Sequence, residues 1–119
     1  MSDTTLIPQR YRDMLKLLGY IYLQNGKTEK AAILFAAVHA VDPLDQSAAE
    51  SLAYAYLRSG AADKALRVVD HFGEQFPVSA LSHLLRSQAL GATGHKAEAA
   101  RSMRKFVLAR TQEERIGGL

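Results

Sequence analysis

The sequence contains no cysteine, and only three of its 119 residues are proline. Without cysteine the chain forms neither a disulfide framework nor a thiolate metal site, which fits a reducing cytosol. Few prolines and many alanines favour helix over strand. Long hydrophobic runs are lacking too: the longest, residues 31–41, is interrupted by His39 and is shorter than the ~20 residues that span a bilayer. We therefore expect a soluble protein without membrane insertion.

An export signal and catalytic motifs are also missing. The first residues, MSDTTLIPQRYR, have no apolar core behind a basic flank, so we predict no signal peptide. No GxxxxGK[ST] or GxGxxG loop is present to bind phosphates. The histidines form neither an HExxH pair nor an i, i+4 metal-binding face; they are His39, His71, His83 and His95. We expect a protein that is not an enzyme and that has no metal site and no cofactor.

The net charge of +3 is unevenly distributed. Residues 1–79 carry eight Lys/Arg against nine Asp/Glu, a net charge of −1, and residues 80–119 carry seven against three, a net charge of +4. A basic third of this kind attracts nucleic acid or an acidic protein, or is simply a solvated helix face. Because no aromatic residues interleave the cations and no RNA-binding motif is present, we do not expect nucleic-acid binding.

A spacing of 34 residues recurs along the chain, and it relates the segments NGKTEKAA, SGAADKAL and TGHKAEAA. Fixed periods of this length indicate stacked structural repeats. The residues that repeat at this spacing are Gly26, Gly60 and Gly94; Ala31, Ala65 and Ala99; Pro43 and Pro77; Tyr22 and Tyr56; and Leu18 and Leu52.

Each period predicts two helices. Apolar residues of Tyr11–Asn25 recur at helical spacing, and Gly26 ends that helix in the left-handed conformation. Thr28 is expected to cap the next helix, which ends before Pro43. Asp45 or Ser47 and then Ser79 are expected to cap later helices. The six predicted helices span about 10–25, 28–41, 46–59, 62–75, 79–93 and 96–110.

Small residues are expected where the helices cross closely, and large ones in the space between them. The small residues are Gly19, Ala31, Ala53, Ala65 and Ala99. The large ones, which we interpret as core, are Leu18, Tyr22, Phe35, Leu52, Tyr56, Val69 and Phe72.

These positions resemble the tetratricopeptide signature, W-x2-L-G-x2-Y then A-x3-F then P. The first repeat matches it with Leu15 in place of the tryptophan and then with Leu18, Gly19, Tyr22, Ala31, Phe35 and Pro43. The second keeps Leu52, Ala53, Tyr56, Ala65 and Pro77, and the third keeps Ala99. The resemblance implies an all-α fold of three helix-turn-helix repeats in a short right-handed superhelix. It would be a single domain over residues 1–119, with repeats at about 12–45, 46–79 and 80–113.

One face of the first helix of each repeat is expected to line a groove that binds a partner peptide. Tyr20, Tyr54 and Gln88 are 34 residues apart and form a ladder along this face. Aromatic anchors such as these dominate peptide binding. The alternative is that both tyrosines are half-buried structural residues, and the groove is slightly favoured over it. The predicted groove residues are Lys16, Tyr20, Leu23, Gln24, Glu50, Tyr54, Leu57, Arg58, Leu81, Leu84 and Gln88.

A second predicted surface lies at the end of the last repeat. The tail TQEERIGGL is too short and too rich in glycine to form a capping helix, so Met103, Phe106, Val107 and Leu108 risk exposure. We expect a partner protein, or a second copy in a homodimer, to cover this end.

Residues 17–43 have the sequence LLGYIYLQNGKTEKAAILFAAVHAVDP. This sequence resembles the opening repeat of small tetratricopeptide chaperones of bacterial type III secretion, in particular the YscY (SctY) group. The similarity comprises an L-Q-x-G turn at residues 23–26, an A-x-I-L-F stretch at residues 31–35, and Asp42-Pro43. It implies a protein of the bacterial cytoplasm that holds a small early export substrate of the YscX kind and helps present it to the export-gate protein. A chaperone of translocator or needle subunits, and a general protein-interaction scaffold, are the alternatives.

Overall fold

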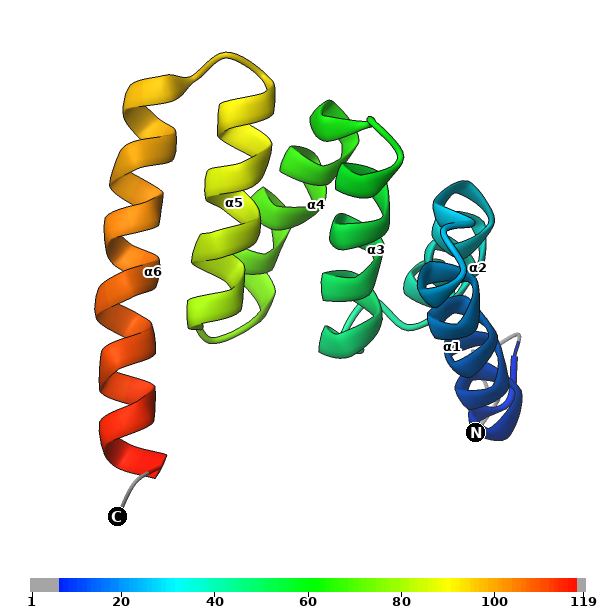
Figure 1. Ribbon diagram of the computed structural model, residues 1–119. Helices are drawn as coiled ribbons and strands as arrows, with labels where there is room; N and C mark the ends of the chain where they lie inside the picture. Colours follow the sequence, from blue (N-terminus) through cyan, green and yellow to red (C-terminus); the bar gives the residue numbers. More distant parts are fainter. Residues whose placement is uncertain (1–6, 118–119) are drawn as a thin grey trace. The chain divides into compact units, whose positions relative to one another are not determined.

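The computed structural model describes residues 7–117, and this part of the chain is entirely helical, without a strand. The all-α prediction is therefore confirmed. The six helices, shown in Figure 1, are α1 (Gln9–Gln24), α2 (Thr28–Val41), α3 (Gln46–Arg58), α4 (Ala62–Gln75), α5 (Ala80–Ala92) and α6 (Lys96–Gly117). The first half of the segment in which we predict no export signal lies outside the described residues.

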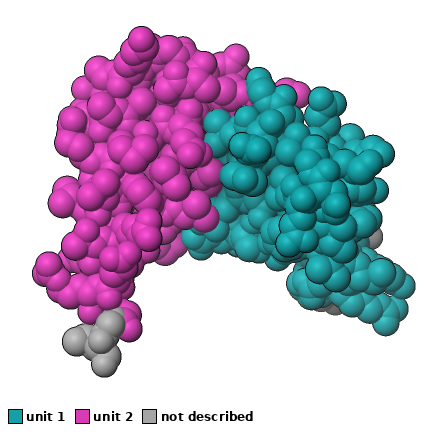
Figure 2. Space-filling view, viewed as in Figure 1, with its two compact units in different colours: residues 1–60 teal, residues 61–119 magenta. Residues whose placement is uncertain are grey.

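The chain divides into two compact units, residues 1–60 and residues 61–119, which Figure 2 colours separately. In the first unit α2 packs against both α1 and α3, and in the second α5 packs against both α4 and α6. The middle helix of each triplet therefore packs against both of the others.

The predicted turns are present. Gly26, Gly60 and Gly94 all adopt positive φ, between 74° and 89°. This region is open to glycine at little cost, whereas a side chain is strained there. In the turns after α1 and α5 the third residue after the helix, Lys27 or His95, donates its N–H back into the last turn at 2.8 Å. The helices α1, α3 and α5 thus end where the 34-residue spacing places a glycine.

The helix starts are only partly as predicted. Asp45 caps α3, because its carboxylate accepts a hydrogen bond from the Ala48 N–H. Ser79 caps α5 in a reciprocal arrangement with Ser82. The prediction that Thr28 caps α2 is wrong: Lys27 precedes the helix, Thr28 is its first residue, and no side chain caps it. The next N–H groups of α2 instead begin the backbone ladder, with Ala31 donating to the Lys27 carbonyl.

The core contains most of the expected residues. Phe35 is fully buried, and a Cβ added to Gly19 would lie 2.7 Å from its ring, so the two helices of this pair approach too closely for any larger residue. Leu18 is a correction, since it is 40% exposed rather than buried. The expected core residues that are buried are Gly19, Ala31, Phe35, Leu52, Ala53, Ala65, Val69 and Phe72.

The last helix is longer than predicted, because α6 continues to Gly117 instead of ending near residue 110. Its last two turns are held by specific contacts. Glu113 Oε2 accepts a hydrogen bond from the Ala80 N–H at 2.9 Å, and Arg110 pairs with Glu114 one turn away. Glu113 therefore places a carboxylate at the N-terminus of α5, where N–H groups lack partners and the helix dipole favours negative charge.

Candidate protein-binding surfaces

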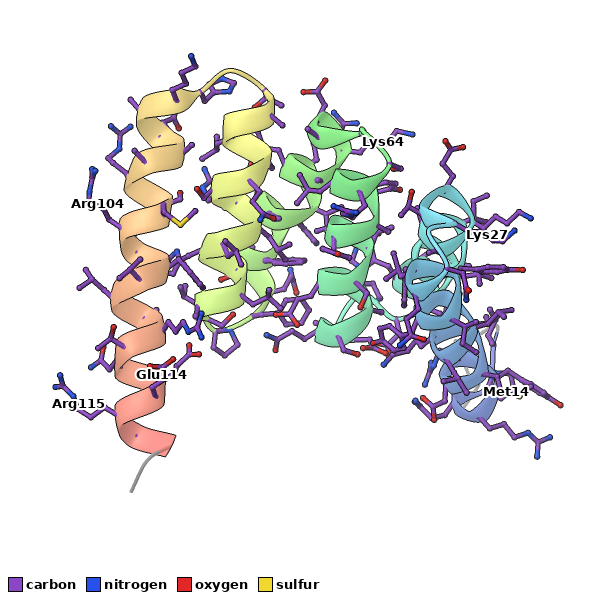
Figure 3. All side chains as sticks on the ribbon, in the orientation of Figure 1. Met14, Lys27, Lys64, Arg104, Glu114 and Arg115 are labelled. Carbon is purple, nitrogen blue, oxygen red and sulfur yellow. The ribbon has the colours of Figure 1, made fainter. Side chains whose placement is uncertain are left out.

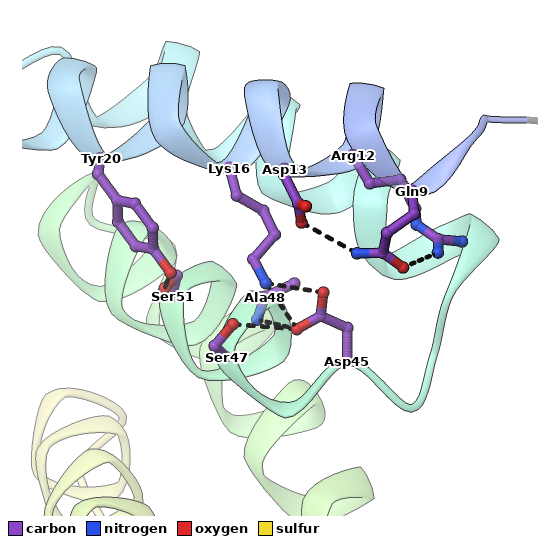
Figure 4. A network of polar contacts seen from close by, with 9 residues as sticks. All are labelled: Gln9, Arg12, Asp13, Lys16, Tyr20, Asp45, Ser47, Ala48 and Ser51. Atoms are coloured by element: carbon purple, nitrogen blue, oxygen red, sulfur yellow. Dashed lines mark hydrogen bonds and ion pairs between the residues drawn. The ribbon is translucent and has the colours of Figure 1, made fainter.

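The predicted groove residues of α1 lie next to α3 within the first unit. Figure 4 shows Lys16 and Tyr20 extending from α1 toward the beginning of α3. Lys16 Nζ lies 2.8 Å from Asp45 Oδ2, and Ser51 Oγ lies 3.4 Å from the Tyr20 hydroxyl. Two of the residues that we predicted to contact a ligand thus already contact the neighbouring helix.

The Lys16–Asp45 ion pair is largely removed from solvent, with 17% and 11% of the two side chains exposed. Partial burial raises the pKa of Asp45, but hydrogen bonds from Lys16, the Ala48 N–H and Ser47 outweigh it. The pKa of Asp45 consequently lies below its ordinary value of 3.8. Asp45 both caps α3 and anchors α1, so Lys16 is a structural cation.

The two tyrosines of the predicted ladder differ in their surroundings. The Tyr20 ring packs on Phe35, with 5.1 Å between the ring centroids. Tyr54 on α3 is 43% exposed and has no hydrogen bond or ring contact with any residue of 7–117. Both side chains are similarly exposed, 37% for Tyr20 and 43% for Tyr54, but Tyr20 is already engaged with Phe35 and Ser51.

The other predicted groove residues fall on α1, α3 and α5. Glu50 is half-buried and accepts a hydrogen bond from Gln46 one turn earlier. Together with Tyr54 and Arg58 it lies on one side of α3, at spacings of four residues. Those that are exposed are Gln24, Arg58, Leu81 and Gln88, and those that are half-buried are Leu23, Glu50, Leu57 and Leu84.

A surface that the sequence analysis did not single out lies on α1. Met14, Leu17, Leu18 and Ile21 are all exposed, and Met14 and Leu17 retain 62% and 61% of their accessible surface. With Leu15 they line an open depression on the helix. We call these four exposed residues the outer face of α1. The core side of the same helix packs on α2, where Gly19 lies against the ring of Phe35.

The predicted end surface lies on α6. Met103 and Val107 are exposed, as is Leu108, whereas Phe106 is half-buried. Met103, Val107 and Leu108 line an open depression together with Arg104. In Figure 3, Arg104 extends from α6 on the side away from α5.

The described residues suggest no other kind of site. Within 7–117 no three His, Cys, Asp or Glu side chains come close enough together to hold a metal ion. None of the helices in this part of the chain is long and apolar enough to cross a membrane.

Comparison with known proteins does not assign the chain to a family. No protein-family model matches it, and no curated protein matches it significantly.

Proposed function

We propose that the protein is a tetratricopeptide-type chaperone that holds a segment of another polypeptide against its exposed helix faces. The main support for this proposal is the exposure of the four apolar residues that form the outer face of α1. Contiguous exposed apolar residues on a soluble domain mark a site of association. Met14, Leu17, Leu18 and Ile21 form such a group on one side of one helix.

The shape and chemistry of this face favour a polypeptide over a small molecule. A small-molecule site is concave and places a few polar groups to orient its ligand. The depression on α1 is open and is lined by aliphatic side chains alone. An amphipathic helix laid along α1 would cover Met14, Leu17 and Ile21 at the spacing of one helix face.

We also propose that the six helices form tetratricopeptide-type repeats. Six helices, with left-handed glycines 34 residues apart after the first, third and fifth, support three helix-turn-helix repeats that form a short right-handed superhelix. The resemblance of residues 17–43 to the YscY group supports, as part of this proposal, a partner that is a small early export substrate of a bacterial type III system. The chaperone would keep this substrate soluble in the cytoplasm and help deliver it to the export gate.

The test is site-specific crosslinking during co-expression with the small proteins encoded by neighbouring genes. A photo-crosslinking residue at Leu17 should yield an adduct with one such protein, and the same residue at Ile33 should not. Ile33 is the matched control because it is exposed and apolar but lies on α2, outside this face. A chaperone should also increase the soluble fraction of the protein that it captures.

The substitution Leu17→Lys completes the test. Covering one leucine contributes about 1.5–3 kcal/mol, so the variant should bind its partner about 10- to 100-fold more weakly. Ile33→Lys should bind like the wild type. Crosslinks from position 17 only to a second copy of the chain would show that the face is a dimer interface, and the chaperone proposal would fail.

A further inference from the structure

The exposed side of α6 combines aliphatic and cationic side chains. Met103 and Val107 are one helical turn apart, as are Arg104 and Leu108, so the four side chains form a continuous surface. We call them the α6 patch. Leu108 is 70% exposed and Val107 is 53% exposed. This surface lies in the second unit and is separate from the outer face of α1.

The cations on and beside the α6 patch are not neutralised. Among residues 7–117 no carboxylate lies within ion-pair distance of Arg101, Arg104 or Lys105. The carboxylates near the end of α6 are engaged elsewhere, since Glu113 accepts from the Ala80 N–H and Glu114 pairs with Arg110. The helix therefore presents excess positive charge to solvent.

The positive charge of α6 also affects the pKa of His83, which lies on α5. Burial lowers the pKa of His83, Lys105 lowers it further, and Glu113 acts in the opposite direction. The net pKa lies below 6.5. The protonated form of His83 is therefore disfavoured beside the cations of α6.

We infer that the α6 patch is a docking site for an acidic amphipathic helix of another protein. Aliphatic residues on such a helix would cover Met103, Val107 and Leu108, and flanking Glu or Asp side chains would pair with Arg101 and Arg104. The positive charge of the patch favours an acidic partner over a second copy of the chain, because a second copy docking through the same patch would bring like charges together.

Nucleic acid fits the patch less well than an acidic helix. Single strands are bound by exposed aromatic side chains on which bases stack, and Phe106, the aromatic residue of α6, is half-buried. A duplex backbone would face Val107 and Leu108 between the cations, where phosphates gain no contact. Aliphatic residues interleaved with arginine are the complement of an amphipathic protein segment.

The experiment is a selection from a displayed library of helical peptides, carried out on the wild-type chain and on the double variant Arg101→Glu/Arg104→Glu. Wild type should enrich peptides with Leu or Ile at one-turn spacing and Glu or Asp beside them. The double variant should lose these peptides and enrich Lys- or Arg-rich ones. The matched control, Lys27→Glu/Arg67→Glu, changes the net charge by the same amount at exposed positions outside the patch.

Binding of one enriched peptide is then measured by fluorescence anisotropy. Two exposed ion pairs contribute up to about 1 kcal/mol each, and reversal also adds repulsion, so the double variant should bind at least about tenfold more weakly. Met103→Ala/Val107→Ala should weaken binding too, with helicity by circular dichroism unchanged. Both effects should be absent in the control.

Three results would overturn the inference. The first is the enrichment of the same peptides on the wild type and the double variant. The second is a single-stranded oligonucleotide that binds more tightly than the selected peptide, with a steep loss of affinity in salt. The third is self-association through α6, seen by sedimentation and lost in the double variant. None of these bears on the α1 crosslinking test, so this inference and the proposed function can fail independently.

Discussion

Gly19 of α1 lies directly against the ring of Phe35 of α2, with no room for a Cβ between them. Gly19→Ala should therefore destabilise the protein by about 1–3 kcal/mol, the usual cost of overpacking a core. Gly73→Ala is the control, because Gly73 is helical and has no atom within 4 Å of an added Cβ. It should stabilise the protein by about 0.5–1 kcal/mol. The free energy of unfolding of each variant is measured by urea denaturation. Changes in the same direction for Gly19→Ala and Gly73→Ala would contradict the prediction.

Lys16 and Asp45 provide a prediction that depends on pH. Asp45→Asn keeps an acceptor for the Ala48 N–H but removes the ion pair, so stability at pH 7 should fall by about 1 kcal/mol. The pKa of Asp45 is lowered in the folded protein, and its contribution is therefore complete well above pH 3.8 and is lost as the pH falls below it. The difference between variant and wild type should narrow below about pH 4. A difference that stays constant down to pH 2.5 would exclude the ion pair as its source.

The two ladder tyrosines should respond differently to truncation. Tyr20→Ala removes the contact with Phe35 and should lower the free energy of unfolding by about 1–2 kcal/mol. Tyr54→Ala removes no hydrogen bond or ring contact within the described residues, so the loss of stability should be smaller than for Tyr20→Ala. If α3 contributes to partner binding, Tyr54→Ala should weaken capture of the protein identified by crosslinking. Equal destabilisation by both substitutions would make Tyr54 a structural residue.

Glu113 gives a local prediction. Glu113→Ala should destabilise the protein by about 0.5–1.5 kcal/mol, because the Ala80 N–H loses its acceptor and the α5 N-terminus loses a negative charge. Hydrogen exchange at the Ala80 amide, followed by NMR, should accelerate. Glu114→Ala breaks only an exposed pair with Arg110 and should leave that amide unchanged. Faster exchange in both variants would indicate general fraying of α6 instead.

Local signals were sufficient to predict most helix boundaries. Gly26, Gly60 and Gly94 end helices because backbone geometry demands positive φ there, and Asp45 and Ser79 cap helices with their own side chains. The predicted last helix ended too early, near residue 110, because the glycines at 117 and 118 favour an irregular tail over a helix. The Arg110–Glu114 spacing of one turn was the signal for a longer helix.

The candidate surfaces were harder to predict. Apolar residues occur on more than one side of α1, and packing determines which side faces Phe35, whereas periodicity alone does not. A helical wheel would have placed Met14, Leu17, Leu18 and Ile21 opposite Gly19, and that was the available signal. The excess charge of the last third was visible as composition. Composition alone did not predict that this charge is left unpaired on α6. That result depends on the folded structure, in which Glu113 contacts Ala80 and Glu114 pairs with Arg110.

The three left-handed glycines have a consequence for chirality. An added Cβ would meet nothing within 4 Å at Gly26, Gly60 or Gly94, so these corners exclude L-residues by stereochemistry and not by crowding. A mirror-image residue fits the same backbone without strain. D-Alanine introduced by chemical ligation would thus preserve each bend while reducing the freedom of the unfolded chain, which makes the corners natural positions for stiffening the protein without touching either surface.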